Sequence, residues 1–369
     1  FEATVAERMP QVSIVAQEPQ PEDNVPVSLS GPAVLRPAQF LVSMYGLPGY
    51  FEFDPSAFLF LSFLAFFGMC LGDAVYGVLI VLMALRLQKR FRDYAGVRAL
   101  FELLFWGGIA SFVVGVATGA WASNLWAEEY LGEGNVVARA VNAVSLGDPL
   151  DKPMIVLGVA LMMGVANQFW GILVQMYGSW RKGDVAGALF DGGFWLLLLP
   201  GVLLLIAPTF VPGVPPGLFT AGKWLAIGGA AGLVLTQGRK QKGVISKAVV
   251  GLISLYGIVG TYGVVAFVSD VLSYSRLLAL GLTTTIVGLA VNIVAGMVQE
   301  AVGVALLGGV LFLVVAVPGH IFNLLISGLS AFIHSARLIF VEFFSRFYEP
   351  RAERFAPLGA GYGRIRVVD

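Results

Sequence analysis

The chain has 369 residues, of which 57% are hydrophobic and only 12% are charged. Soluble domains carry about a quarter of their residues as charged side chains, so this balance excludes an ordinary soluble domain and indicates an integral membrane protein. Lys and Arg equal Asp and Glu in number, 23 each, so the formal net charge is zero. We therefore expect no nucleic-acid partner, because such proteins carry a basic patch.

The first 54 residues are polar and rich in proline, and they contain no apolar run of membrane length. This composition predicts a cytoplasmic connector at 1–54, followed by a membrane domain at 55–348 and a cytoplasmic tail at 349–369. The chain begins at Phe1 rather than Met. We therefore expect a further part of the protein upstream of the connector.

Apolar runs recur along the membrane domain, and most have roughly the 17 to 25 residues that a helix needs to cross a bilayer. We expect eight transmembrane helices, at about 55–70, 72–87, 99–125, 153–177, 186–207, 222–237, 247–299 and 304–348. The last two runs exceed the bilayer thickness, so these helices must tilt, project, or break at Gly257, Gly260, Gly308, Gly309 or Pro318. Tilt is the preferred interpretation. The predicted fold class is an all-α integral membrane protein with eight transmembrane helices, the last two long and tilted.

Glycines recur four residues apart within several of these runs. The pairs are Gly68 and Gly72, Gly115 and Gly119, and Gly228 and Gly232. Membrane helices approach closely where small residues line the contact. We therefore expect these glycines to lie at contacts between helices.

The positive charges fall mainly on one side of this arrangement. The connections after the second, fourth and sixth runs, together with the C-terminal tail, hold sixteen of the 23 Lys and Arg. The opposite side holds only Arg139, Lys152 and Lys223. Because cytoplasmic loops are enriched in Lys and Arg, both termini are predicted to be cytoplasmic.

Arg276 and Arg337 lie deep inside the last two runs, where a guanidinium is costly and cannot lose its proton. Ser273 and Thr283 share a helical stripe with Arg276. Asp270 lies six residues earlier, about 240° around the helix, and is therefore a poor partner for Arg276. Arg276 needs an acidic partner from outside its own helix.

The last run repeats this design. Four polar side chains follow on one helical face at steps of seven, four and three: Asn323, Ser330, His334 and Arg337. Both histidines of the chain, His320 and His334, lie in this run. A histidine can pass protons near neutral pH, whereas Arg337 only holds charge. No Cys or acid stands at ligand spacing from either histidine, so no metal site is expected.

Several functional classes fit an arginine inside a membrane helix. A secondary transporter or channel could bind an anion at Arg276, but it should show unwound half-helices or an internal repeat nearby. Residues 273–282 instead predict a continuous helix. A structural anchor would hold both arginines in ion pairs. An enzyme with its own chemistry is least favoured, because neither a P-loop nor a Ser, His and Asp set is suggested.

Four stretches resemble the membrane domain of the a/I subunit of rotary vacuolar-type and archaeal-type ATPases, especially the bacterial version. They are YGLPGYFEFDPSAF at 45–58, FFGMCLGDAVYG at 66–77, SYSRLLALGL at 273–282 and GHIFNLLISGLSAFIHSARLIFVEFFSRFYE at 319–349. The resemblance extends from about residue 30 to the C terminus. It implies eight transmembrane helices whose long, tilted final pair faces a rotating ring of proteolipid (c/L) subunits.

By this resemblance, Arg276 matches the family's essential arginine, Arg337 its second arginine, and His334 a nearby histidine. The implied function is a stator subunit that forms two proton half-channels against the ring and couples ion translocation to rotation. The acidic partner of Arg276 is then expected on the ring. Where eukaryotic relatives carry an acid before the essential arginine, this chain has Tyr262.

The resemblance also suggests which polar residues line each path. We expect Arg337 and His334 on the cytoplasmic path, with Ser273 beside Arg276, and on the outer path Asn323, His320, Asn292 and Gln299. Possible further lining residues are Asp73, Glu102, Asn167, Gln168, Gln175 and Asp191.

The implied partners are the proteolipid ring, the other subunits of the membrane sector, membrane lipids, and peripheral stalk subunits through the expected upstream part. No cofactor is implied, and ATP chemistry is expected in another subunit. The predicted location is a bacterial or archaeal plasma membrane.

Overall fold

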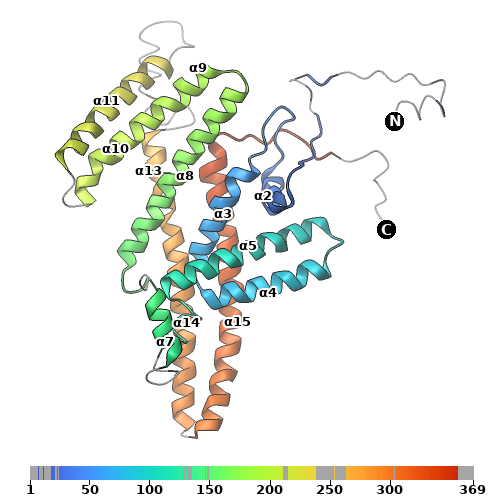
Figure 1. The fold of residues 1–369 in the computed structure, drawn as a ribbon, viewed down its shortest axis with the longest axis vertical. Helices are drawn as coiled ribbons and strands as arrows, with labels where there is room; N and C mark the ends of the chain where they lie inside the picture. Colours follow the sequence, from blue (N-terminus) through green and yellow to red (C-terminus); the bar gives the residue numbers. More distant parts are fainter. Residues whose placement is uncertain are drawn as a thin grey trace.

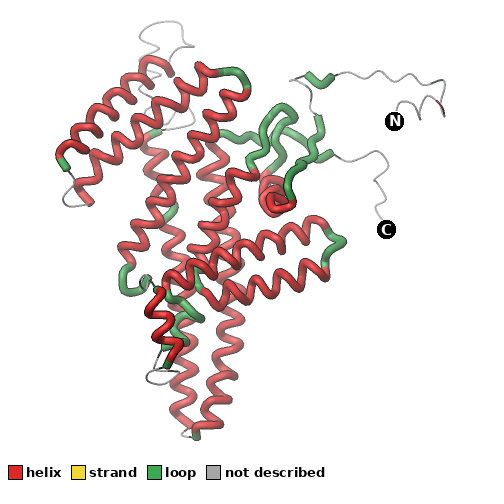
Figure 2. The backbone as a smooth tube through the Cα atoms, viewed as in Figure 1, coloured by secondary structure: helices red, strands yellow, loops and turns green. Residues whose placement is uncertain are grey.

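The computed structural model describes residues 25–127, 130, 135–145, 147, 149–210, 215–237, 263–302 and 304–355, with residues 7, 11, 18–20, 23 and 253 (Figure 1). Within these residues the secondary structure is helical and no β-sheet forms (Figure 2). This confirms the all-α prediction for the described part of the chain.

Six helical segments are long and apolar enough to cross a membrane: Ala95–Thr118, Pro153–Arg181, Val185–Pro208, Pro216–Thr236, Val264–Val302 and Leu306–Arg346. Helix α3 (Ser56–Leu71) is apolar but shorter. It is followed by α4 (Ala74–Arg90), whose last turn carries Lys89 and Arg90. The number of eight crossings therefore stays a prediction.

Three pairs of consecutive helices pack as hairpins. They are α4 with α5 (Ala95–Thr118), α10 (Phe194–Phe210) with α11 (Pro216–Gln237), and α14 (Ser275–Val302) with α15 (Ala305–Arg337). Helix α3 packs against α5, α14 and α15, and α8 (Pro153–Arg181) packs against α13 (Val264–Ser273) and α14. In Figure 1 the α4–α5 hairpin crosses the α14–α15 hairpin at a large angle. The helices of both hairpins therefore cannot be perpendicular to the plane of one membrane.

The smaller elements lie at the ends of these helices. They are η1 (Ala33–Leu35), α2 (Arg36–Tyr45), α7 (Val136–Val144), α9 (Val185–Gly187) and the π-helical segment η2 (Ala188–Gly193). Helix α15 continues into a second π-helical segment, η4 (Leu338–Phe343), and a 3₁₀ turn, η5 (Phe344–Arg346).

The last helix is unbroken where the sequence allowed a break. Helix α15 runs through Gly308, Gly309 and Pro318, whereas the other two candidate positions, Gly257 and Gly260, lie outside the described residues. An interruption occurs instead at Tyr274, between α13 and α14. Residues 273–282 are therefore not one continuous helix as predicted. The interruption is one residue long, because Leu277 N donates to Tyr274 O at 3.0 Å and tightens the turn.

The glycine pairs serve two purposes rather than one. A Cβ at Gly68 would lie 3.0 Å from the Ala110 backbone, and one at Gly115 would lie 2.1 Å from Ala74 N, so these glycines are helix contacts as predicted. Gly72 and Gly119 instead end α3 and α5, with φ of 53° and 76°. This left-handed conformation favours glycine at a helix end.

The two glycines of the third pair, Gly228 and Gly232, also differ from each other in role. A Cβ at Gly232 would lie 2.2 Å from the Phe194 ring, which makes Gly232 a contact between α11 and α10, whereas Gly228 has nothing within 4 Å. Spacing alone does not separate a glycine that ends a helix, or one that faces open space, from one that lies in a contact.

The segments that flank the membrane helices pack together at one end of the molecule. Helix α2 buries Ala38, Leu41 and Val42 completely against α3 and α5. The segment after η5 runs back beside it, where Val27 N donates to Glu353 O at 2.8 Å and Arg351 N donates to Leu47 O at 3.1 Å. The described part of the predicted connector is thus joined to the end of the last helix.

Candidate functional site

Polar side chains gather in two places among the apolar helices. One group, here the arginine cluster, lies where α8, α13, α14 and η4 meet and consists of Gln168, Asp270, Arg276, Glu342 and Arg346. The other, here the histidine cluster, lies between α4, α14 and α15 and consists of Tyr76, Asn292, His320, Asn323 and Ser327.

Arg276 stands at the beginning of α14, directly after the interruption at Tyr274. Its side chain is 23% exposed, and its Nη1 lies 4.0 Å from Oε1 of Glu342, whose side chain is only 4% exposed. Ser273 also neighbours the Glu342 carboxylate. The guanidinium therefore has a buried carboxylate on one side and the surface of the protein on the other.

A second ion pair lies next to the pair of Arg276 and Glu342. Arg346 at the end of η5 pairs with Asp270 on α13, so Asp270 has its partner on another helix. Gln168 connects the two pairs, because its Nε2 donates to Asp270 Oδ2 at 3.4 Å and to the backbone oxygen of Glu342 at 3.2 Å. Buried charges are tolerated when they are paired, and here each charge lies next to one of opposite sign, with Asp270 also accepting from Gln168.

His334 and Arg337 lie on α15 next to the arginine cluster. His334 is partly buried and within electrostatic reach of Arg276 and Arg337. Arg337 is exposed, on the same helical stripe as Ile333 and Val341, which are 50% and 55% exposed. Arg337 thus presents a charge on an otherwise apolar outer face.

The histidine cluster brings together three of the residues predicted on the outer path. His320 Nε2 and Asn292 Oδ1 are 2.7 Å apart, and His320 Nδ1 and the Tyr76 hydroxyl are also 2.7 Å apart. The Asn292 amide donates to Ala122 O and Asn124 Oδ1, both at 3.0 Å, so its oxygen is left to accept. His320 therefore donates through Nε2 to Asn292.

Asn323 closes this network. Its amide donates to the Tyr76 hydroxyl at 3.0 Å and to Thr284 O at 2.9 Å, and its oxygen accepts from the Ser327 hydroxyl at 3.0 Å. Gln299 lies apart from the cluster, exposed near the end of α14.

Asp73 lies beside the histidine cluster and holds two backbone segments together. Oδ1 accepts from Tyr76 N at 3.0 Å, which caps α4, and from Ala122 N at 3.1 Å. Oδ2 accepts from Ser123 N at 2.8 Å. Ala122 and Ser123 have positive φ, so this carboxylate stabilises an uncommon turn.

The other predicted lining residues are distributed as follows. Glu102 joins Arg98 and Arg36 at 2.8 and 3.3 Å, between α5 and α2. Asp191 lies in η2, which packs against α8, α10 and α11. Asn167 accepts from the Ser62 hydroxyl at 2.8 Å and donates to the Tyr274 hydroxyl at 2.7 Å. Gln175 lines a pocket at the end of α8.

Four residues of these clusters were not predicted from the sequence: Glu342, Arg346, Tyr76 and Ser327. Glu342 is the acid within this chain that lies beside Arg276, so expecting the acid only on another subunit was incomplete. Glu342 could have been identified from the sequence, because an acid inside an apolar membrane helix is by default a functional candidate. Tyr76 lies among apolar residues of α4 without any distinguishing spacing, and only its contacts identify it.

A mostly apolar layer separates the two clusters, with Thr284 and Ser335 buried in it beside Cys70. Arg276 and Asn292 are sixteen residues apart on α14, about 24 Å at the rise of an α-helix. Between the clusters lie fully buried Leu277, Ala331 and Leu338, packed with Phe66 and Cys70 of α3. The two polar clusters are therefore distinct sites within one hairpin.

Comparison with known proteins identifies relatives of this chain, although no family model matches it. It is 32% identical to A-type ATP synthase subunit I of Methanocaldococcus jannaschii over 94% of this chain, and 31% identical to that of Pyrococcus horikoshii over 93%. V-type ATP synthase subunit I of Chlamydia trachomatis is 24% identical over 92%.

The matched part amounts to 51%, 49% and 57% of these three relatives, so the chain spans about half their length. The match nevertheless includes almost all of the chain and therefore both polar clusters. Along more than nine-tenths of its length, this membrane protein belongs with subunit I of the A-type and V-type ATP synthases.

Proposed function

We propose that this chain is the stator membrane subunit of a rotary ATPase, in which two proton half-channels meet a ring of proteolipids. The observation that carries the proposal is the position of Arg276, between a buried carboxylate and an open helical face. The relationship to subunit I supports the same function.

The open face belongs to the α14–α15 hairpin. It includes Leu272 on α13 and Ile286 and Met297 on α14, which are 57%, 50% and 65% exposed, and Arg276 lies at its edge. On α15, Arg337 lies in an apolar exposed stripe. An arginine facing lipid would cost several kcal/mol. A proteolipid surface that carries a carboxylate would satisfy both the apolar stripes and the charges.

The proposed proton transfer follows from the charges of the ring carboxylate and of Arg276. A ring carboxylate must be neutral while it crosses lipid, because an ionised one is too costly there. The Arg276 guanidinium favours the ionised form, so a carboxylate arriving opposite it releases its proton. Arg276 cannot deprotonate, so protons do not pass through it from one path to the other.

The two clusters supply the two paths. The arginine cluster lies toward the Lys- and Arg-rich end of α8, and we assign it, with His334 and Arg337, to the cytoplasmic side. The histidine cluster contacts the 119–124 segment and is assigned to the outer side. We propose that α4 and α5 cross the membrane and that α14 and α15 are tilted within it, because the two hairpins cross each other at a large angle (Figure 1).

ATP-driven proton uptake into vesicles that contain the assembled complex tests this function. Arg276→Ala should abolish uptake without loss of assembly, and Arg276→Lys should retain little, because a compact ammonium does not replace the guanidinium fork. Uptake at the wild-type rate in Arg276→Ala would refute the assignment.

Arg337→Gln is the matched control, since it removes an arginine from the same hairpin. We expect it to slow proton uptake without abolishing it, because Arg337 is exposed and lies beside the Arg276–Glu342 pair rather than in it. Complete loss of uptake in an assembled Arg337→Gln complex would contradict its auxiliary role.

A further inference from the structure

A mostly apolar groove lies between α3 and α8. Both helices pack against α14, and the groove between them has a volume of about 390 Å³. Its lining includes Phe58, Leu61 and Ala65 of α3 and Met163 and Trp170 of α8. Leu61 is 75% exposed and Trp170 is 41% exposed. The groove is therefore open to the outside of the helix bundle.

Aromatic rings continue from this groove toward the Lys- and Arg-rich end of α8. Trp170 Nε1 donates to Phe58 O at 3.2 Å, and the Phe58 ring centroid lies 5.9 Å from that of Phe53 and 6.1 Å from that of Tyr177. Trp180, near the last residue of α8, is 65% exposed. Trp and Tyr are enriched where a membrane helix reaches the aqueous phase. These rings therefore indicate that this end of the groove lies at a membrane surface.

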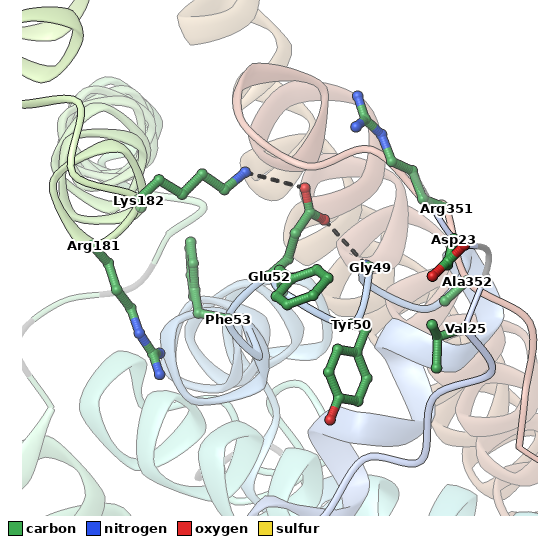
Figure 3. A pocket seen from close by; sticks show the side chains of 12 residues that line it. Asp23, Val25, Gly49, Tyr50, Glu52, Phe53, Arg181, Lys182, Arg351 and Ala352 are labelled. Carbon is green, nitrogen blue, oxygen red and sulfur yellow. Dashed lines mark hydrogen bonds and ion pairs between the residues drawn. The ribbon is translucent and has the colours of Figure 1, made fainter. Parts of the chain in front are cut away.

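A basic pocket of about 770 Å³ adjoins the aromatic rings, since Phe53 also lines it. Three cations share in its lining: Arg181 and Lys182 at the end of α8, and Arg351 after η5. Lys182 Nζ lies 3.2 Å from Oε1 of Glu52. Figure 3 shows Lys182 turned toward Glu52, whereas Arg181 points away from it.

Arg181 is the cation of this pocket that remains available to a ligand. Arg351 pairs with Glu349, and the second acid of the lining, Asp23, accepts from the Gln20 N–H at 2.7 Å. Arg181 is exposed and forms no ion pair with any residue that the structure describes. The lining thus has a surplus of positive charge. A guanidinium binds a phosphate through two parallel hydrogen bonds, so an anionic phosphate group is the complementary ligand.

The distance along α8 matches the length of a phospholipid. Arg181 lies eleven residues after Trp170, about 17 Å at the rise of an α-helix. The hydrocarbon of one leaflet is about 15 Å thick, half of the bilayer core. A phospholipid whose phosphate lies at Arg181 therefore has acyl chains long enough to reach the groove beside Trp170.

We propose that the groove and the basic pocket together bind one anionic phospholipid, with its phosphate at Arg181 and an acyl chain between α3 and α8. The surplus positive charge favours a head group with a net negative charge. A zwitterionic head group would instead bring its ammonium next to Lys182 and Arg351. This inference goes beyond the proposed function and requires only that the groove lie in a membrane.

Quenching of Trp170 fluorescence by brominated lipids tests the site. Small mole fractions of phosphatidylglycerol or phosphatidylcholine, each brominated in its acyl chains, are added to detergent micelles that hold the assembled complex. The Trp170 signal is the quenching that occurs in the wild type and is lost in Trp170→Phe. Half-maximal quenching should require several-fold less phosphatidylglycerol than phosphatidylcholine, because a head group without net charge gains little from the surplus positive charge.

Arg181→Gln should raise the required fraction of phosphatidylglycerol at least about tenfold, because it removes a charge-assisted hydrogen bond, and should remove most of the preference for the anionic lipid. Lys152→Gln is the matched control, since Lys152 is an exposed cation at the opposite end of α8, and it should leave the quenching unchanged. If Trp170→Phe does not assemble, Leu61→Trp adds an indole to the same groove, and the added quenching is measured instead.

Equal half-maximal fractions of the two lipids, or the same phosphatidylglycerol fraction in Arg181→Gln as in the wild type, would overturn the proposed lipid site. Inorganic phosphate, added at constant ionic strength, should leave the quenching in place, because it has no acyl chain for the groove. Complete reversal of the quenching by inorganic phosphate would also overturn the lipid assignment and leave a site for a free anion.

Discussion

At the scale of single residues, Glu342 determines how Arg276 behaves when no other carboxylate is near. The pair is separated by 4.0 Å rather than by a close hydrogen bond, and the carboxylate is the more deeply buried of the two. A weakly held guanidinium can exchange one carboxylate for another, whereas a tightly bonded pair would have to be broken first. Under the proposed function, this spacing suits an arginine that meets a succession of ring carboxylates.

The pair can be examined by a double-mutant cycle. Removing one partner of a buried ion pair costs about 3–5 kcal/mol, because the other charge is left uncompensated. Glu342→Leu alone should therefore lower the apparent melting temperature of the purified complex by several degrees. Glu342→Leu combined with Arg276→Met should recover part of this loss. Additive losses in the double variant would show that the two side chains do not interact.

At the scale of elements, the close approach of α4 and α5 depends on glycine. A Cβ at Gly115 would lie 2.1 Å from Ala74 N and 2.5 Å from the carbonyl carbon of Asp73, both backbone atoms. Backbone atoms at a helix start cannot move aside as the end of a side chain can. The same contact positions Asp73, which caps α4 and holds the turn beside the histidine cluster.

Gly115→Ala should therefore destabilise the protein by at least about 1–3 kcal/mol, the usual cost of overpacking. Gly158→Ala on α8 is the control, because its Cβ would meet nothing within 4 Å and alanine favours a helix over glycine by about 1 kcal/mol. Thermal unfolding of the two purified variants compares them directly. A Gly115→Ala variant as stable as Gly158→Ala would contradict the contact.

At the scale of the whole molecule, the α14–α15 hairpin extends beyond the other helices and presents two exposed stripes (Figure 1). Under the proposed function this surface meets the proteolipid ring. Ala279 and Thr283 follow Arg276 on α14 and are exposed, whereas Leu277 is fully buried in the core.

Ala279→Cys should accordingly form a cross-link to a small proteolipid when the native membrane is treated with a thiol reagent. Leu277→Cys should not, because its side chain points into the core between α14 and α3. The mass of each cross-linked product shows whether the cysteine has been linked to a proteolipid. Cross-linking of both positions to the same extent would indicate that the open face is not the contact surface.

Composition and apolar periodicity were sufficient to predict helices at nearly all the described membrane segments, because these signals depend on local residues alone. The arginine at the centre of one cluster was also evident, since charge inside an apolar run is rare. The Arg276–Glu342 and Asp270–Arg346 pairs were not predicted, because each joins segments about seventy residues apart in the sequence. Likewise, the interruption at Tyr274 depends on tertiary packing: the Tyr274 ring lies against Gly164 and its hydroxyl accepts from Asn167.

The apolar layer between the two clusters also has an electrical consequence. Unit charges about 24 Å apart interact by about 0.7 kcal/mol at an effective dielectric constant of about 20. This is roughly half a pKa unit, below the level at which two titrations become coupled. A proton that arrives in one cluster therefore leaves the other almost unaffected. Under the proposed function, the two clusters are therefore electrostatically independent, and communication between them requires a carrier that moves.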